Sequence, residues 1–468
     1  MTLSKTLIHD FRFWILVYFF IRLIGILNPP LEVAHNWRQV TVNMVARNYL
    51  EVDANLFYPR VDMAGEKSGI TGMEFPLLNY LIFIVAKIFG FEHWYGRLIN
   101  LVVSSLGIFC FYLIIKKRFS PSLAFYAGII LLNSIWFSYS RKIMPDTFSI
   151  SFTLMGLYFA LEYLYEKNSL LNLFLYVLFG LLGLLSKIPA AVILTVLCIS
   201  LFDNSVNVKS KIFLITGSVL ILIPVIAWYF YWVPYLVSKF GYWHYYMGTT
   251  FSLGFREIVT KLGEFAKKFY FEALKFSGFI LFLAGLFFLT KKINRKLTLT
   301  FLITTAIFLV FVIKAGRGFY HHSYYIIPFV PTMSLIAAWA VTNIKFKKVR
   351  YFLMIVFILE GILNQYHDFR IKKEDSYRLG LEVIADSVCN QHDLVAINGD
   401  ANPRDLYFTH RKGWTISQDE LFDTGYLKIL AEKGCKYLFI DKKAADFHLP
   451  AMPFIKVYED DHYTIFRF

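Results

Sequence analysis

The sequence predicts a polytopic α-helical membrane protein with about eleven transmembrane helices and a small C-terminal extracytoplasmic α/β domain. Two observations lead to this fold class. Hydrophobic residues make up 57% of the 468 residues and charged residues only 17%, which is too little charge to cover a soluble protein of this size. Apolar runs near twenty residues in length also recur along the chain, and 211–232 is an example. Such runs match the hydrocarbon thickness of a bilayer.

The expected spans follow one another along the chain. We interpret the first apolar run, about 13–29, as a retained span and not a signal peptide, because no small-residue cleavage site follows it. The other spans are expected at about 96–115, 121–139, 147–165, 169–186, 189–203, 211–232, 273–290, 298–313, 323–342 and 350–366.

Basic loops predict the orientation of these spans. The clusters at 116–118, 291–296 and 345–350 are expected on the cytoplasmic side. The N-terminus is then cytoplasmic and the C-terminus lies outside an inner (cytoplasmic) membrane. The apolar run 75–91 is interrupted by Lys87, and counting it as a span would put all three clusters outside. We therefore expect an interfacial or re-entrant helix there, with a twelfth span as the alternative.

Two domains are expected from this topology. Residues 1–366 form the transmembrane domain, with external loops at 30–75 and 233–272, and residues 367–468 form the α/β domain. In the latter, the segments 393–399, 436–441 and 463–468 resemble strands, and 377–388 and 424–434 resemble amphipathic helices. The net charge of +15 is read by side of the membrane, so no nucleic-acid partner is expected.

Polar residues gather in the connectors that this topology places outside. They are His35, Arg38, Asp62, Glu74, Asp146, Lys187, Arg317, His321, His322 and Tyr325. Each has an ordinary structural interpretation: Asp146 could cap a helix, Lys187 could reach the headgroups, Asp62 could be a loop charge, and the histidines could be interfacial. External cations from several connectors nevertheless oppose the positive-inside trend, which indicates a bound anion.

A lipid-linked phosphate is the anion that suits such a site. Arg and Lys would hold its oxygens by charged hydrogen bonds, and these contacts strengthen if the phosphate is a leaving group. A nearby carboxylate could take the proton of an attacking hydroxyl. The hypothesis is transfer of a sugar from a polyprenyl-phosphate donor, within the lipid bilayer, to an extracytoplasmic acceptor. That acceptor could be a glycan, a lipid-linked glycan or a protein.

Five short motifs follow one another in a familiar order. They are "EFPLLNYL" (74–81), Arg97, "MPD" (144–146), "LSKIPA" (185–190) and "YYIIPFVP" (324–331). Over roughly residues 10–345 this order resembles the C-type (GT-C) glycosyltransferases of the protein O-mannosyltransferase and lipid A aminoarabinose transferase type. The resemblance implies an inverting membrane glycosyltransferase that uses a polyprenyl-phosphate sugar, with no cofactor and no metal at a nucleotide site.

The sequence departs from that family at the position of the catalytic base. Family members carry an acidic residue or pair early in the first external loop, where this chain reads Arg38-Gln39. Glu74 is our first substitute, because the helix after Pro76 should bring it toward the cavity, and Asp62 and His35 come next.

Two other classes of function remain open. A transporter or flippase of lipid-linked saccharides would be favoured by inverted repeats and charges at the membrane midplane, which the sequence does not show. A non-catalytic envelope-assembly subunit fits the absence of the acidic pair.

Overall fold

The chain folds into two compact units. The computed structural model describes residues 8–243, 248–443 and 452–468. One unit, here called the helical unit, contains Met1–Ile26, Arg97–Tyr229 and Tyr246–Phe369. The other, here called the sheet unit, contains Leu27–Gly96, Phe230–Tyr245 and Arg370–Phe468. The expected loop 30–75 thus lies in the same unit as the C-terminal segment, and the expected loop 233–272 is divided between the two units.

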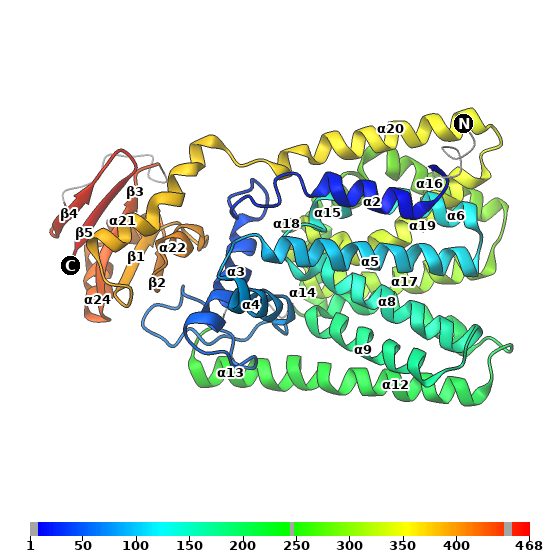
Figure 1. Cartoon of the computed structure of the whole chain (residues 1–468), viewed down its shortest axis with the longest axis horizontal. Helices are drawn as coiled ribbons and strands as arrows, with labels where there is room; N and C mark the ends of the chain where they lie inside the picture. Colours follow the sequence, from blue (N-terminus) through cyan, green and yellow to red (C-terminus); the bar gives the residue numbers. More distant parts are fainter. Residues whose placement is uncertain (1–7, 244–247, 444–451) are drawn as a thin grey trace. The chain divides into compact units, whose positions relative to one another are not determined.

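The helical unit consists of apolar helices joined by short connectors (Figure 1). Its elements are α2 (Phe11–Arg22), α5 (Tyr95–Arg118), α6 (Pro121–Asn133), α7 (Trp136–Tyr139), α8 (Pro145–Tyr165), α9 (Leu170–Ser186), η1 (Ile188–Ala190), α10 (Ala191–Leu194), α11 (Leu197–Leu201), α12 (Val208–Ile226), η2 (Ala227–Trp232), α14 (Phe251–Thr260), α15 (Leu262–Lys267), η3 (Lys268–Ala273), α16 (Lys275–Lys291), α17 (Arg295–Ala315), α18 (Arg317–His321), η4 (Ser323–Phe329), α19 (Val330–Asn343), α20 (Lys347–Gln365) and η5 (Tyr366–Phe369).

Several of these helices can cross a bilayer, which makes the chain a multi-pass membrane protein. Among the described residues, six stretches are long and apolar enough: Tyr95–Arg118, Pro145–Tyr165, Val208–Phe240, Arg295–Ala315, Ser323–Asn343 and Lys347–Phe369. A seventh is possible if Leu262–Ala273 and Lys275–Lys291, which meet at 97°, form one broken span. Shorter apolar helices lie at Leu77–Phe89, Pro121–Asn133, Leu170–Ser186 and Ile188–Leu201. The count of eleven spans and the interfacial position of 75–91 stay predictions.

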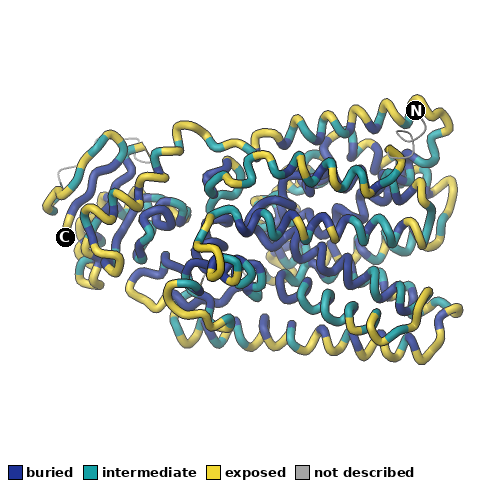
Figure 2. The backbone as a smooth tube through the Cα atoms, in the orientation of Figure 1, coloured by how far each residue is buried: buried dark blue, intermediate teal, exposed yellow. Residues whose placement is uncertain are grey.

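Close packing inside the helical unit brings α8 and α9 together. Figure 2 shows α8 and α19 almost wholly buried, whereas α12 and α20 carry exposed residues along their length. Gly183 of α9 lies so near α8 that a Cβ atom there would be 2.6 Å from Cγ2 of Thr153. Only a residue without a side chain allows this approach. The start of α8 and the end of α9 therefore lie side by side.

The sheet unit combines helices from the first loop with the C-terminal sheet. Its elements are α3 (Asn36–Glu51), α4 (Leu77–Phe89), α13 (Val233–Phe240), η6 (Lys373–Gly380), α21 (Leu381–Val388), β1 (Leu394–Asn398), α22 (Arg404–Thr409), β2 (Gly413–Ile416), α23 (Gln418–Phe422), α24 (Thr424–Glu432), β3 (Cys435–Asp441), β4 (Ile455–Glu459) and β5 (Tyr463–Arg467).

The five strands form one mixed sheet in the order β2-β1-β3-β5-β4. Strands β2, β1 and β3 are parallel, and β5 and β4 are antiparallel additions at the other side. The three strands expected from the sequence are present as β1, β3 and β5. Two strands were not expected: β2 has only four residues, and β4 is mostly exposed, so neither carries a strong alternating pattern.

One hydrophobic core joins the first loop to the C-terminal sheet. It contains Val40, Met44, Tyr49, Val61 and Phe83 from the loop, and Leu381, Val395, Leu406, Phe439 and Ile465 from the C-terminal segment. The other face of the sheet is covered by α23 and α24, whose Leu421 and Leu427 are buried against Leu438 and Ile440. The sheet is therefore buried on both faces.

The first loop also covers the edge strand β2. The Gly413 N–H donates to the Asp62 carbonyl at 2.9 Å, and the Gly65 N–H donates to the Gly413 carbonyl at 2.7 Å. Gly65 has a left-handed backbone with φ of 58°, and the Trp414 indole occupies the place where a Cβ would stand. This position therefore needs glycine.

A histidine ties α3 to α21 in the same unit. His410 Nδ1 lies 2.6 Å from Glu382 Oε1, and its Nε2 lies 2.9 Å from Glu51 Oε2. The hydrogen bonds to Glu382 and then Glu51 raise the pKa of His410 to about 9, against the opposing effect of burial. The side chain is thus a cation between two carboxylates at neutral pH.

Candidate functional site

Asp146 lies at the start of α8, in the helical unit. Pro145 occupies the first turn, where its missing N–H costs no hydrogen bond. The carboxylate of Asp146 follows in the same turn, beside backbone N–H groups that favour negative charge. Asp146 is only 4% exposed, so the side chain needs a cationic partner.

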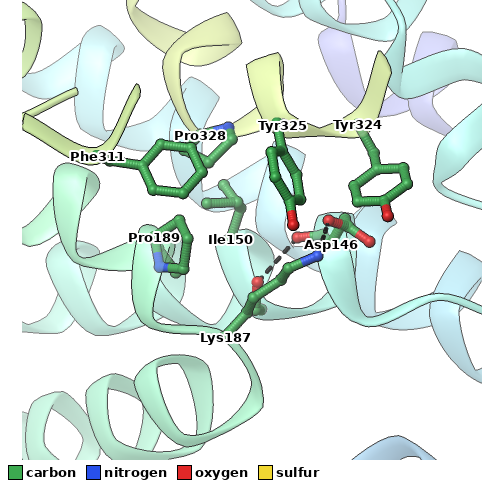
Figure 3. Close-up of a pocket in the computed structure, with 10 residues that line it drawn as sticks. Asp146, Ile150, Lys187, Pro189, Phe311, Tyr324, Tyr325 and Pro328 are labelled. Atoms are coloured by element: carbon green, nitrogen blue, oxygen red, sulfur yellow. Dashed lines mark hydrogen bonds and ion pairs between the residues drawn. The ribbon is translucent and has the colours of Figure 1, made fainter. Parts of the chain in front are cut away.

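That partner is Lys187, which ends α9. Its backbone is extended, and Pro189 follows in η1, so the chain turns away from the helix axis at this point. The ammonium forms an ion pair with the Asp146 carboxylate (Figure 3). It also lies 4.7 Å from the ring centroid of Tyr324 and 5.6 Å from that of Tyr325, within the range of cation–π attraction.

The two tyrosines come from η4, directly after the cationic connector singled out in the sequence. His322 stacks on Tyr324 with 5.1 Å between ring centroids. The hydroxyl groups of Ser323 and Tyr139 are 2.5 Å apart, which fixes η4 to α7. Three connectors that are distant in sequence are therefore held together in one place, as Figure 3 shows for Asp146, Lys187 and Tyr325.

A small cavity lies between these side chains. It is lined by Asp146, Ser149, Ile150, Lys187, Pro189, Ala190, Phe311, Tyr324, Tyr325 and Pro328. Its volume of about 10 Å³ is room for about one water molecule. Oδ2 of Asp146 is buried and has no hydrogen-bond partner among the described residues. The ion pair thus fills the site, and a larger anion could reach Lys187 only by displacing Asp146 from it.

Two other predicted residues of the same connector lie elsewhere. Arg317 and His321 are exposed on α18 and are not among the residues that line the cavity. The backbone N–H of Arg317 donates to Glu257 at 2.7 Å.

Two neighbouring cations that the sequence also places outside make contacts within the helical unit. Lys142 lies 3.4 Å from Asp368. Arg141 donates to the carbonyls of Ile24 and Gly25 at 2.7 and 2.8 Å. Both side chains are buried and hold connectors in place.

Glu74, our first candidate for a base, is buried in the sheet unit. It is 2% exposed and forms an ion pair with Arg38, which is 9% exposed. The pair joins the start of α4 to α3. Oε1 of Glu74 is occupied by this contact, whereas Oε2 is buried without a hydrogen-bond partner in the described part of the chain. One carboxylate oxygen is therefore available to accept a proton.

Asp62 and His35 have different surroundings. Both oxygens of Asp62 accept hydrogen bonds, from Arg47 at 3.1 Å and from Asn48 at 2.6 Å. Arg47 also stacks on Tyr407, with 4.6 Å from its guanidinium carbon to the ring centroid. Asp62 therefore holds the loop against α3. His35 precedes α3 in a left-handed conformation with φ of 59° and is half-buried.

Sequence reasoning missed one buried carboxylate of the first loop, Glu32. It is 1% exposed, and Gln39 Nε2 lies 3.4 Å from its Oε2. Its place just before "VAHNWRQ", early in the loop, was the available signal. Tyr324 was missed as well, although it adjoins Tyr325 in the same motif.

Comparisons with known proteins add a family and a fold. Residues 74–232 match the family described as dolichyl-phosphate-mannose-protein mannosyltransferase. No curated protein matches the sequence. ArnT from Cupriavidus metallidurans in the apo state has a similar structure, with a TM-score of 0.62 and 14% identity over 97% of each chain. The same protein bound to undecaprenyl phosphate gives a TM-score of 0.58 and 13% identity, over 98% of this chain and 97% of ArnT.

A second similar fold is the archaeal oligosaccharyltransferase AglB from Archaeoglobus fulgidus, in complex with an inhibitory peptide and a dolichol-phosphate. It gives a TM-score of 0.55 and 12% identity, over 92% of this chain and 69% of AglB. The family match and the shared fold agree with the order of motifs read from the sequence. The chain therefore belongs to the C-type (GT-C) family of membrane glycosyltransferases.

Proposed function

We propose that the protein transfers a sugar, with inversion, from a polyprenyl-phosphate donor to an acceptor on the extracytoplasmic side of the cytoplasmic membrane. The family match and the ArnT-like fold support a lipid-linked donor, since one ArnT structure holds undecaprenyl phosphate and the AglB structure a dolichol-phosphate. The acceptor is a glycan, a lipid-linked glycan or a protein.

The observation that carries the proposal is the buried Lys187–Asp146 pair beneath Tyr324 and Tyr325. A lysine held by a carboxylate at the broken end of a helix is a cation with an exchangeable partner. A phosphate oxygen of the donor would replace Asp146 as that partner, through a charged hydrogen bond. As the sugar leaves, negative charge grows on the phosphate and the contact with Lys187 strengthens. The freed Asp146 would then face the same cavity.

A general base completes the mechanism. The attacking hydroxyl loses its proton as it bonds to the anomeric carbon, and the pair of electrons of the old C–O bond leaves with the phosphate. Glu74 is the proposed base, because its Oε2 is buried and unpartnered among the described residues. Asp62 is a weaker candidate because both its oxygens accept hydrogen bonds, and His35 is the remaining alternative.

Binding of the donor tests the role of Lys187. Lys187→Gln removes the charge but keeps much of the length, so donor affinity should fall about tenfold to a hundredfold, as expected for a lost charged hydrogen bond. Lys209→Gln, an exposed lysine at the start of α12, is the matched control and should bind the donor normally. Equal donor affinity in the two variants would remove Lys187 from the phosphate site.

Turnover tests the reaction itself. Purified full-length protein, a polyprenyl-phosphate sugar and an extracytoplasmic glycan extract should release free polyprenyl phosphate and a glycosylated product. Movement of an intact lipid-linked saccharide across reconstituted vesicles, without cleavage, would instead establish the transporter alternative. Binding without cleavage or movement would favour an assembly subunit.

A further inference from the structure

A second, wider cavity lies at the opposite end of the sequence's first helices, between the start of α2 and the end of α5. It is lined by His9, Asp10, Arg12, Phe109, Tyr112, Leu113 and Lys116 and has a volume of about 750 Å³. Phe11 of α2 stacks on Tyr112 of α5 with 4.6 Å between ring centroids, which fixes the two helices beside each other. We call this cavity the α2–α5 groove. It shares no lining residue with the Lys187 cavity.

The groove carries more positive than negative charge. Arg12 and Lys116 line it with one carboxylate, Asp10, which accepts from the Arg12 side chain at 2.6 Å. Arg12 nevertheless remains 74% exposed on its side chain. The Lys116 ammonium lies 5.7 Å from the Tyr112 ring centroid and is also exposed. The two cations therefore face the space of the groove with a single formal negative charge between them.

The next two basic residues of α5 differ from Lys116. Lys117 pairs with Glu162 at 2.7 Å, and Arg118 pairs with Glu166 at 3.2 Å. Each of these cations has an acidic partner on the end of α8. The difference indicates that the groove, and not the whole basic cluster, is suited to an external anion.

Below the cations, exposed apolar side chains continue along both helices. On α2, Leu16 and Phe20 follow Arg12 at intervals of four residues, with 57% and 64% of their surfaces exposed. On α5, Leu113, Phe109 and Leu106 follow Lys116 toward the helix start at intervals of three or four residues. Such intervals place side chains on one face of a helix. A cationic end with an apolar track beneath it matches a phospholipid in shape and polarity.

We propose that the α2–α5 groove binds an anionic phospholipid of the surrounding bilayer. Arg12 and Lys116 contact the phosphate and the acidic headgroup, and the acyl chains lie along the apolar track. Basic pockets between membrane helices are suited to anionic headgroups. A free anion would use only the cations, so Phe109 and Leu113 favour a lipid. With the orientation predicted from the basic loops, the lipid belongs to the cytoplasmic leaflet.

Lipid retention by the full-length protein tests the proposal. The protein is extracted from vesicles of equal parts phosphatidylglycerol and phosphatidylcholine, and bound lipids are counted by native mass spectrometry. Wild-type protein should retain phosphatidylglycerol in preference to phosphatidylcholine. The double variant Arg12→Gln, Lys116→Gln should lose that preference by about tenfold or more. The control Lys209→Gln, Lys211→Gln changes two basic residues at the start of α12 and should behave as wild type.

A variant that gains binding separates the proposal from misfolding. Asp10 caps α2 by accepting from the Arg12 backbone N–H at 2.9 Å. Asp10→Asn keeps a capping residue but removes the negative charge, so phosphatidylglycerol retention should rise severalfold. Inorganic phosphate should compete weakly, because it lacks acyl chains. Equal retention of both lipids by wild type, unchanged retention in Asp10→Asn, or full competition by phosphate would each overturn the proposal.

Discussion

The stability of the sheet unit should depend on the charge of His410. This side chain lies between Glu51, at the end of α3, and Glu382, at the start of α21. Replacing it with Asn removes the cation and leaves two carboxylates near each other. Asn is also tolerated in the left-handed backbone conformation that His410 adopts, with φ of 52°. His410→Asn therefore isolates the ion pairs from any change in backbone strain.

The magnitude follows from the pKa of His410, which is raised from 6.5 to about 9. A shift of that size corresponds to about 3 kcal/mol of stability. The Glu382 side chain is 50% exposed, so screening by water and salt reduces the expected value to about 2 kcal/mol. Because the folded-state pKa is the higher one, this stability is fully present below about pH 6.5. It is lost as the pH rises through about 9.

Amide hydrogen exchange in β1 measures this effect, since exchange there reports opening of the sheet unit. At pH 6, the opening free energy of His410→Asn should be lower than that of wild type by about 2 kcal/mol, and at pH 10 the two should agree. His392→Asn, which alters an exposed histidine of the same unit, should match wild type at both values. Agreement between His410→Asn and wild type at pH 6 would refute the reasoning.

Three further outcomes are expected. Glu74→Gln should lower turnover about a hundredfold with donor affinity unchanged; normal turnover in this variant beside an inactive Glu32→Gln would transfer the base to Glu32. Gly65→Ala should destabilise the sheet unit by about 1–3 kcal/mol, because a side chain would meet the Trp414 indole, and unchanged opening of β1 would contradict this. Single cysteines within 292–296 should resist a membrane-impermeant thiol reagent in intact cells while cysteines within 380–460 react, and the reverse pattern would invert the topology.

The helices were the most predictable part of the fold. Each expected span coincides with a helix, because apolar runs bounded by charge or by Pro and Gly determine helix position locally. The union of the first loop with the C-terminal sheet was not predictable. It depends on contacts such as Val40 with Phe439, within one core, and periodicity along a sequence carries no information about such distant pairs.

The candidate site was predictable in part. Asp146, Lys187 and Tyr325 meet at one cavity, as expected for connectors that share one side of a bilayer. The partner of each charge was not predictable. Glu74 pairs with Arg38, a residue that the sequence assigned to substrate, because the choice of ion-pair partner depends on tertiary packing.

The covering of β2 by the first loop has a consequence for how the protein is made. Asp62 emerges from the ribosome long before Gly413, and every helix of the helical unit except α2 is synthesised between them. The loop must therefore wait, with its share of the core unburied, until the last membrane helix has been inserted. A chain truncated before Gly413 would carry that apolar loop permanently exposed. Quality-control factors outside the membrane would then have a direct signal that synthesis was incomplete.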